Sequence, residues 1–232
     1  MPQPIEFRGF PKECMTFLKD LKANNTTSWF NQHKGDYEQY VLDPARAFIY
    51  DMGERLHAIT PDIIADPRVN RSLFRINRDT RFSKDKTPYK THLAIWFWEG
   101  AGPRMECSGY YFHLEPDRLM LGVGIYCFPK PLLDRYREYV VHKTHGPALA
   151  KAIQKVTEAS EYTLGGEHFK RVPRGYDADH KYAALLRHNG LYAGIDMAVP
   201  DELFSEELLD YCFDKFYQMK PLHEWLVGLT EG

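Results

Sequence analysis

Apolar residues recur at helical spacing through the first sixty positions. Helical spacing relates Phe10, Cys14, Phe17, Leu18 and Leu21, since each lies three or four residues from another member of this set, and it predicts a helix over residues 10–24. The polar stretch 24–27 ends this helix and can cap a second helix that begins near Ser28. A third helix is expected from Asp43, as the N-cap, to Thr60.

Shorter segments rich in β-forming residues follow in the middle of the chain. Strands are expected at 72–76, 92–98, 109–115 and 118–128, with the last two forming a hairpin around residues 115–118. Side chains alternate between the two faces of a strand. One face of the hairpin is therefore predicted to be core, and it carries Tyr110, Phe112, Leu114, Leu119, Leu121 and Val123.

The other face of the hairpin carries Tyr111, His113, Met120 and two glycines, Gly122 and Gly124. Glycine within a strand indicates a bulge, or a close approach by a ligand or by another part of the backbone. A helix crossing the sheet at this point is the simpler explanation, and both remain open.

Helices return in the last hundred residues. They are expected at 132–143, 147–159 and 183–188, a loop at 160–182, and a further strand at 191–199. The final apolar pattern, 200–226, is expected to break into two helices at Pro221. Because no shift in composition marks a boundary, residues 1–232 are predicted to form a single α+β domain, a central antiparallel sheet flanked by N-terminal and C-terminal helices.

Composition favours a cytoplasmic protein that makes no contact with a membrane. The longest apolar run has six residues, 93–98, and the N-terminus has no secretory pattern. Four scattered cysteines form no C-x-x-C pair, so they are interpreted as reduced, buried thiols. Nothing in the sequence indicates a cofactor or the oligomeric state.

The charge pattern changes this picture at one place, residues 68–90. This segment carries eight basic and two acidic residues, a net charge of +6 in a chain whose net charge is −2. Such a concentration of positive charge predicts a site for an anion. Residues 201–232, with eight acidic and two basic residues, are the natural ion-pairing partner within the chain.

The segment lacks both glycine-rich phosphate-binding motifs, so side chains would have to hold the anion. Arginine suits phosphate and carboxylate because its planar fork donates two parallel hydrogen bonds. The predicted ligand-binding residues are Arg75, Arg78, Asp79, Arg81, Lys84, Lys86, Tyr89, Lys90, Tyr111, His113, Arg171 and Arg174. Asp79 and Asp85 would orient the arginines, while Lys170, Arg171 and Arg174 would close the site.

We expect a phosphate-bearing small molecule or nucleotide as the ligand, ahead of nucleic acid. Two alternatives stay open: an interaction module that binds nucleic acid or an acidic partner through an open basic surface, and a structural loop whose arginines pair with the protein's own carboxylates. The sequence does not decide whether the protein is an enzyme.

Other chemistry has less support in the sequence. His168, Asp177, Asp179 and His180 lie close enough in sequence to be considered as metal ligands, but their spacing matches no metal-binding signature, so no metal site is predicted. Ser83 and Ser108 lack a G-x-S-x-G context, and no nucleophile is predicted.

The segment 74–91 resembles a family of bacterial and fungal proteins known as domain of unknown function 2461. The resemblance continues through residues 109–111, 121–124, 170–176 and 179–180 and covers nearly the whole chain. It implies one soluble domain and supplies no reaction, substrate or cofactor.

Overall fold

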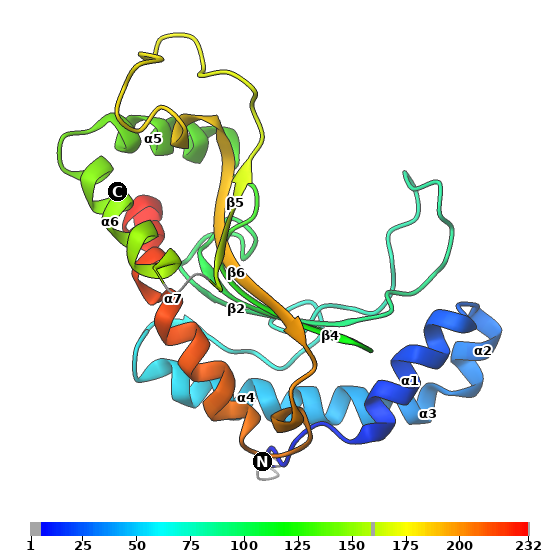
Figure 1. Cartoon of the computed structure of the whole chain (residues 1–232). Helices are drawn as coiled ribbons and strands as arrows, with labels where there is room; N and C mark the ends of the chain where they lie inside the picture. The colour runs from blue at the N-terminus through cyan, green and yellow to red at the C-terminus, as the bar shows by residue number, and fades with distance from the viewer. Residues whose placement is uncertain (1–5, 159–160, 232) are drawn as a thin grey trace. The chain divides into compact units, whose positions relative to one another are not determined.

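The computed structural model describes residues 6–158 and 161–231 (Figure 1). In chain order the elements are α1 (Lys12–Ala23), α2 (Thr27–Gln32), α3 (Lys34–Tyr37), η1 (Glu38–Leu42), α4 (Asp43–His57), β1 (Ile63–Ile64), β2 (Leu93–Glu99), β3 (Gly109–Glu115), β4 (Arg118–Ile125), α5 (Lys130–Val141), α6 (His145–Thr157), β5 (Thr163–Glu167), η2 (Leu185–Arg187), β6 (His188–Ala198), η3 (Asp201–Phe204) and α7 (Leu208–Glu231). The α+β class expected from the sequence is confirmed.

The strands form one six-stranded antiparallel sheet in the order β1-β2-β3-β4-β6-β5. Strand β5 was not expected, because its Thr-Leu-Gly-Gly-Glu sequence has little apolar character. Conversely, the strand predicted at 72–76 is reduced to an isolated bridge between Leu73 and Ile95. The N–H of Phe74 still donates to the carbonyl of Ala94 at 3.1 Å, and the N–H of Trp96 donates to the carbonyl of Ser72 at 2.8 Å. The segment therefore follows the edge of β2 without becoming a regular strand.

The chain divides into two compact units, each built from several segments. The first comprises residues 1–97, 111–120 and 196–214, and the second comprises 98–110, 121–195 and 215–232. Several strands contribute residues to both units. The expectation of a single domain remains a prediction.

Aromatic rings form the core of the first unit. The ring of Phe112 lies 4.9 Å from that of Phe48 on α4 and 6.0 Å from that of Phe10, and the rings of Phe48 and Phe97 are 6.4 Å apart. All six side chains expected on the core face of the hairpin are buried. Because faces alternate along a strand, Tyr111, His113 and Glu115 of β3 lie on the opposite face.

The N-terminal helices lie near their expected positions, but α4 continues directly from the turn η1 instead of starting at a separate cap. Thr26 caps α2, since its hydroxyl accepts a hydrogen bond from the N–H of Trp29 at 3.3 Å. The predicted role of Asp43 as an N-cap is wrong, because Asp43 has helical backbone angles and continues from the π-helical turn η1. An N-cap requires non-helical angles.

Gly124 of β4 in the second unit explains part of the glycine pattern. It adopts φ +132°, and a Cβ atom there would lie 2.3 Å from the carbonyl oxygen of Leu191 on β6. The backbone of the neighbouring strand β6 therefore requires glycine here. The simpler explanation offered by the sequence, a crossing helix, is therefore wrong at this position.

The long helix α7 passes through Pro221 without interruption, so the predicted break into two helices is wrong. The four cysteines are free thiols. Three of them are buried as expected, but Cys127 is exposed, so the expectation of a buried thiol is wrong for that residue. Within residues 6–158 and 161–231, no helix combines the length and the apolar character that crossing a bilayer requires.

Candidate functional site

Residues 75–90, which we call the basic arm, project from the first unit as a long loop (Figure 1). The base of the arm is held by backbone pairing: the N–H of Arg78 donates to Pro88 at 2.9 Å, and the N–H of Lys90 donates to Ile76 at 2.8 Å. Asn25 exchanges two hydrogen bonds with the backbone of Tyr89, at 2.9 and 3.1 Å. These contacts fix the place from which the arm extends.

Two of the predicted ligand-binding residues, Arg78 and Tyr89, make contacts within the protein at the base of the arm. Tyr89 is buried, and its ring stacks on Phe30 with 4.2 Å between centroids. The guanidinium of Arg78 donates to Asp85 and Thr87 on the opposite side of the loop. Both residues therefore brace the arm.

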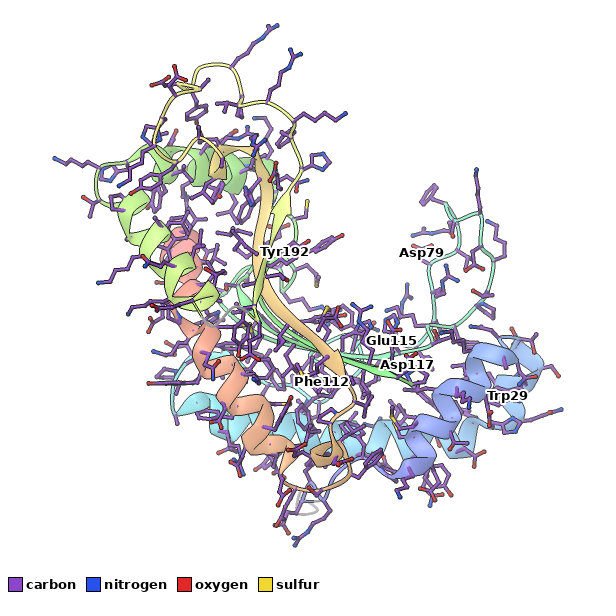
Figure 2. The ribbon with its side chains drawn as sticks, in the orientation of Figure 1. Trp29, Asp79, Phe112, Glu115, Asp117 and Tyr192 are labelled. Carbon is purple, nitrogen blue, oxygen red and sulfur yellow. The ribbon has the colours of Figure 1, made fainter. Side chains whose placement is uncertain are left out.

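The tip of the arm is different, because its side chains face solvent. The side chain of Phe82 is 94% exposed, and the guanidinium of the neighbouring Arg81 lies 5.7 Å from its ring centroid. Arg81 pairs with Asp79 at 2.7 Å, only two residues away, and both side chains are exposed. Figure 2 shows Asp79 on the projecting part of the loop. This pair connects nothing to the body of the protein.

Other cations of the arm have few partners. Lys86 donates to the carbonyl oxygen of Thr80 at 2.8 Å. Within the part of the chain that the structure describes, Arg75 and Lys84 make no hydrogen bond or ion pair; Arg75 interacts only through space with Asp79. The acidic partners of Arg78 and Arg81 thus come from the arm itself rather than from residues 201–232, as the structural alternative had supposed.

Hydrogen bonds hold the pKa of both arm carboxyls at about 2. For Asp79 the largest cause is the side-chain hydrogen bond from Arg81. For Asp85 it is the backbone N–H of Thr87, followed by Arg78. Both groups are therefore ionised at neutral pH, and the net charge of the arm remains positive.

A cleft of about 450 Å³ in the first unit does not suit an anion. Its lining residues include Glu6, Asp51, Glu54, Glu206, Glu207 and Asp210, with Arg55 as the basic member. Arg55 already pairs with Asp210. This concave region repels phosphate, and the basic arm lies outside it.

A second cluster lies on the face of β2 and β3 opposite the aromatic core. His113 hydrogen-bonds through Nδ1 to the hydroxyl of Tyr111 and through Nε2 to Glu115, each at 2.9 Å. The ring of His92, the residue before β2, stacks on the ring of His113 with 4.2 Å between centroids. Glu115 closes the cluster at the end of β3, where Figure 2 shows it.

Burial sets the protonation of this cluster. It lowers the pKa of His92 to about 4, with further lowering by the nearby charges of His113 and Lys90. Burial also raises the pKa of Tyr111 to about 12. The hydrogen bond from His113 lowers the pKa of Glu115. At neutral pH the cluster thus offers an uncharged imidazole and a carboxylate.

Three of the sequence-predicted ligand residues come together here. The ring of Phe74 lies 6.3 Å from Tyr111, and the ammonium group of Lys90 lies 5.3 Å from the ring of Phe74. Lys90, Tyr111 and His113 therefore share one neighbourhood. Sequence reasoning missed Glu115 as a member, although Glu115 follows His113 by two residues and so had to share its face.

The remaining predicted residues lie elsewhere. Arg171 and Arg174 are exposed in the loop between β5 and η2 of the second unit, and their part in closing a site stays a prediction. Among residues 6–158 and 161–231, three metal-ligating side chains gather at His92, His113 and Glu115, with ligand atoms within 4.8 Å of one another. The sequence-derived candidates His168, Asp177, Asp179 and His180 form no such group within those ranges.

The second unit contains a buried serine, a buried histidine and a half-buried carboxylate in one chain of hydrogen bonds. Ser108 lies 2.9 Å from Nδ1 of His223, whose Nε2 lies 2.8 Å from Glu99. The three types match those of acyl-transfer triads, but the nitrogens are used in the opposite order. Ser108 has no exposed surface, so a substrate cannot reach it. We interpret this network as structural.

Comparison with known proteins identifies a family that matches this chain. Residues 13–225 match the family described as conserved hypothetical protein (DUF2461). The chain belongs to the DUF2461 family. The match covers most of the chain, including the basic arm and the cluster of His92, His113 and Glu115. It confirms the resemblance carried by residues 74–91.

One curated relative of this DUF2461 protein is Dicer-like protein 1 of Cryphonectria parasitica. The two are 32% identical over 109 residues, which is 45% of this chain and 7% of that protein. The chain therefore spans a small fraction of that relative, and the similarity carries no activity across.

Proposed function

We propose that this DUF2461 protein is an interaction module that binds single-stranded nucleic acid through the tip of its basic arm. The observation that carries the proposal is Phe82, whose ring is 94% exposed at the tip, between Arg81 and Lys84. Exposing an aromatic ring to water is unfavourable. Bases stack on such rings whatever their sequence, and adjacent cations follow the phosphate backbone.

The ion pairs of the arm are compatible with this exchange. Water screens both charges of an exposed ion pair, so replacing Asp79 by a phosphate at Arg81 costs little. Among residues 6–158 and 161–231, Arg75 and Lys84 make no hydrogen bond that a phosphate would have to replace. The base of the arm, with Arg78 and Tyr89 in place, would stay ordered while the tip binds.

A projecting arm suits a polymer better than a small phosphorylated molecule. Small-ligand sites are concave and bury most of their ligand, whereas the cleft of this unit is lined by carboxylates. A nucleic acid strand needs no cleft, because it can lie along the arm. Free nucleotide or sugar phosphate binding is therefore the alternative outcome to be tested.

The test is fluorescence anisotropy of a labelled single-stranded oligonucleotide with the purified full-length chain. We expect Phe82→Ala to weaken binding about 10-fold, given ~1–3 kcal/mol per stacked base. The pair Arg81→Gln and Lys84→Gln should weaken it further. The matched control is Lys151→Gln with Lys155→Gln on α6, which removes the same charge from an exposed surface outside the arm.

Three results would contradict the proposal: no binding by the wild type at low salt, equal loss in the α6 control, or complete competition by free nucleotide at equal phosphate concentration. The last result would favour a small-ligand site. Circular dichroism of each variant checks that folding is unchanged, which the exposure of Phe82, Arg81 and Lys84 leads us to expect.

A further inference from the structure

We propose that His92, His113 and Glu115 bind a divalent transition-metal ion, with zinc as the probe. Their ligand atoms lie within 4.8 Å of one another, and Nε2 of His113 is already 2.9 Å from Glu115. Ligands at ~2.1 Å around a tetrahedral zinc ion stand about 3.4 Å apart. A small movement of the His92 ring therefore completes the geometry.

The backbone supplies this arrangement without strain. His113 and Glu115 are two residues apart on β3, so both point to the same face, and His92 directly precedes the neighbouring strand β2. The His92 ring makes no hydrogen bond within the described parts of the chain; its ring contact is the stack on His113. Turning this ring toward a metal would therefore break no hydrogen bond among those residues.

The donor set selects the class of ion. Two imidazole nitrogens and one carboxylate suit zinc and other first-row transition metals, whereas calcium and magnesium prefer oxygen ligands alone. The side chains of His113 and Glu115 are 13% and 30% exposed, so the cluster is sheltered but open on one side. Coordination positions would remain for water or another ligand.

Tyr111 can adjust the proton of His113 when the metal binds. In the metal-free protein the Tyr111 hydroxyl can donate to Nδ1 while the Nε2–H of His113 donates to Glu115. Metal binding needs the lone pair of Nε2, so the single imidazole proton must move to Nδ1. The Tyr111 oxygen then accepts it, because a hydroxyl both donates and accepts. No proton is lost overall.

Tyr111 is thus a positioning residue, of the kind that fixes the tautomer and direction of a metal-bound histidine. Tyr111→Phe keeps the ring but removes this acceptor. We expect it to weaken zinc affinity about 10-fold, in the range of 10–100-fold found for such partners. A purely structural tyrosine would leave the affinity unchanged.

The main experiment titrates zinc into the untagged full-length chain, freed of metal by a chelator, in a calorimeter. We expect one zinc per chain. Glu115→Gln and His113→Gln should each weaken binding more than the ~10-fold expected for Tyr111→Phe, because both residues supply ligand atoms. Glu115→Gln conserves shape at a partly exposed position, so it remains informative if His113→Gln fails to fold. The control, His168→Gln with His180→Gln, removes two histidines of the second unit.

Cobalt(II) substitution provides a second readout. Bound at this cluster, cobalt should give visible bands of a nitrogen and oxygen site without the near-ultraviolet thiolate band that any of the free cysteines would produce. The proposal is overturned if the wild type binds no zinc, if Glu115→Gln binds as the wild type does, or if the control abolishes binding. A thiolate band would also overturn it.

Discussion

Arginines of the basic arm have two different roles, although they lie within a few residues of each other. Arg78 is 28% exposed and joins the two sides of the arm, while Arg81 is 77% exposed and pairs only with Asp79. A single residue type thus braces the loop at one place and is available to an external anion at another. The two roles differ in the exposure of the arginine and in how far along the sequence its carboxylate partner lies.

This division predicts how Asp79 titrates. Its pKa of about 2 lies below the ordinary value of ~3.9 mainly because Arg81 donates to it. The group thus stabilises the folded arm above pH ~4, and that contribution is lost as pH falls toward 2. Arg81→Gln should raise the pKa of Asp79 toward its ordinary value.

Carboxyl titration followed by NMR measures this pKa. The pKa of Asp85 serves as the internal control, because its largest cause is the N–H of Thr87, which Arg81→Gln does not alter. An unchanged Asp79 together with a shifted Asp85 would mean that the two pairs are exchanged in solution, and that the tip and the base of the arm do not differ as described.

At the scale of elements, the sequence indicates segments better than connections. Helical spacing located α1, α4, α5 and α6, and alternation located the β3–β4 hairpin with its buried face, because burial imposes both periods. The π-helical turn before Asp43 and the helix through Pro221 were missed. Both depend on packing that overrides local preference.

The candidate sites show the same limit. The positive charge of the arm and the shared face of Tyr111 and His113 could be read from the sequence. The approach of His92 to His113 could not, since it depends on β2 lying beside β3. Likewise, the glycine at 124 signalled a close approach, but only the sheet order identifies β6 as the neighbour.

The network of Ser108, His223 and Glu99 connects elements of the second unit, which leads to a prediction about stability. Ser108→Ala leaves Nδ1 of buried His223 without its partner. An unsatisfied buried polar group costs about 1–3 kcal/mol. We expect the free energy of unfolding, measured by urea denaturation, to fall by this amount.

Ser83→Ala is the matched control, because the same hydroxyl is removed at the tip of the arm, where its side chain has no hydrogen-bond partner among the described residues. It should change the free energy of unfolding by less than ~0.5 kcal/mol. Equal effects of the two substitutions would show that the buried network contributes nothing specific to stability.

At the scale of the whole molecule, the charges are divided unequally. The segment 68–90 carries +6 while the rest of the chain sums to −8, so a polyanion is attracted to this segment more strongly than to the rest of the chain taken together. Binding to single-stranded nucleic acid should then depend on the few cations of the arm tip alone. A protein with basic surface throughout would behave differently.

This concentration of charge predicts the salt dependence of binding. Each phosphate neutralised on a single strand contributes about −0.7 to the slope of log K against log salt concentration. If Arg75, Arg81, Lys84 and Lys86 each contact one phosphate, the slope is about −3, and Arg81→Gln with Lys84→Gln should reduce its magnitude by about 1.4. Phe82→Ala should weaken binding at every salt concentration but leave the slope unchanged, because stacking releases no counterions. A slope that persists in the charge variant would place the contacts away from the arm.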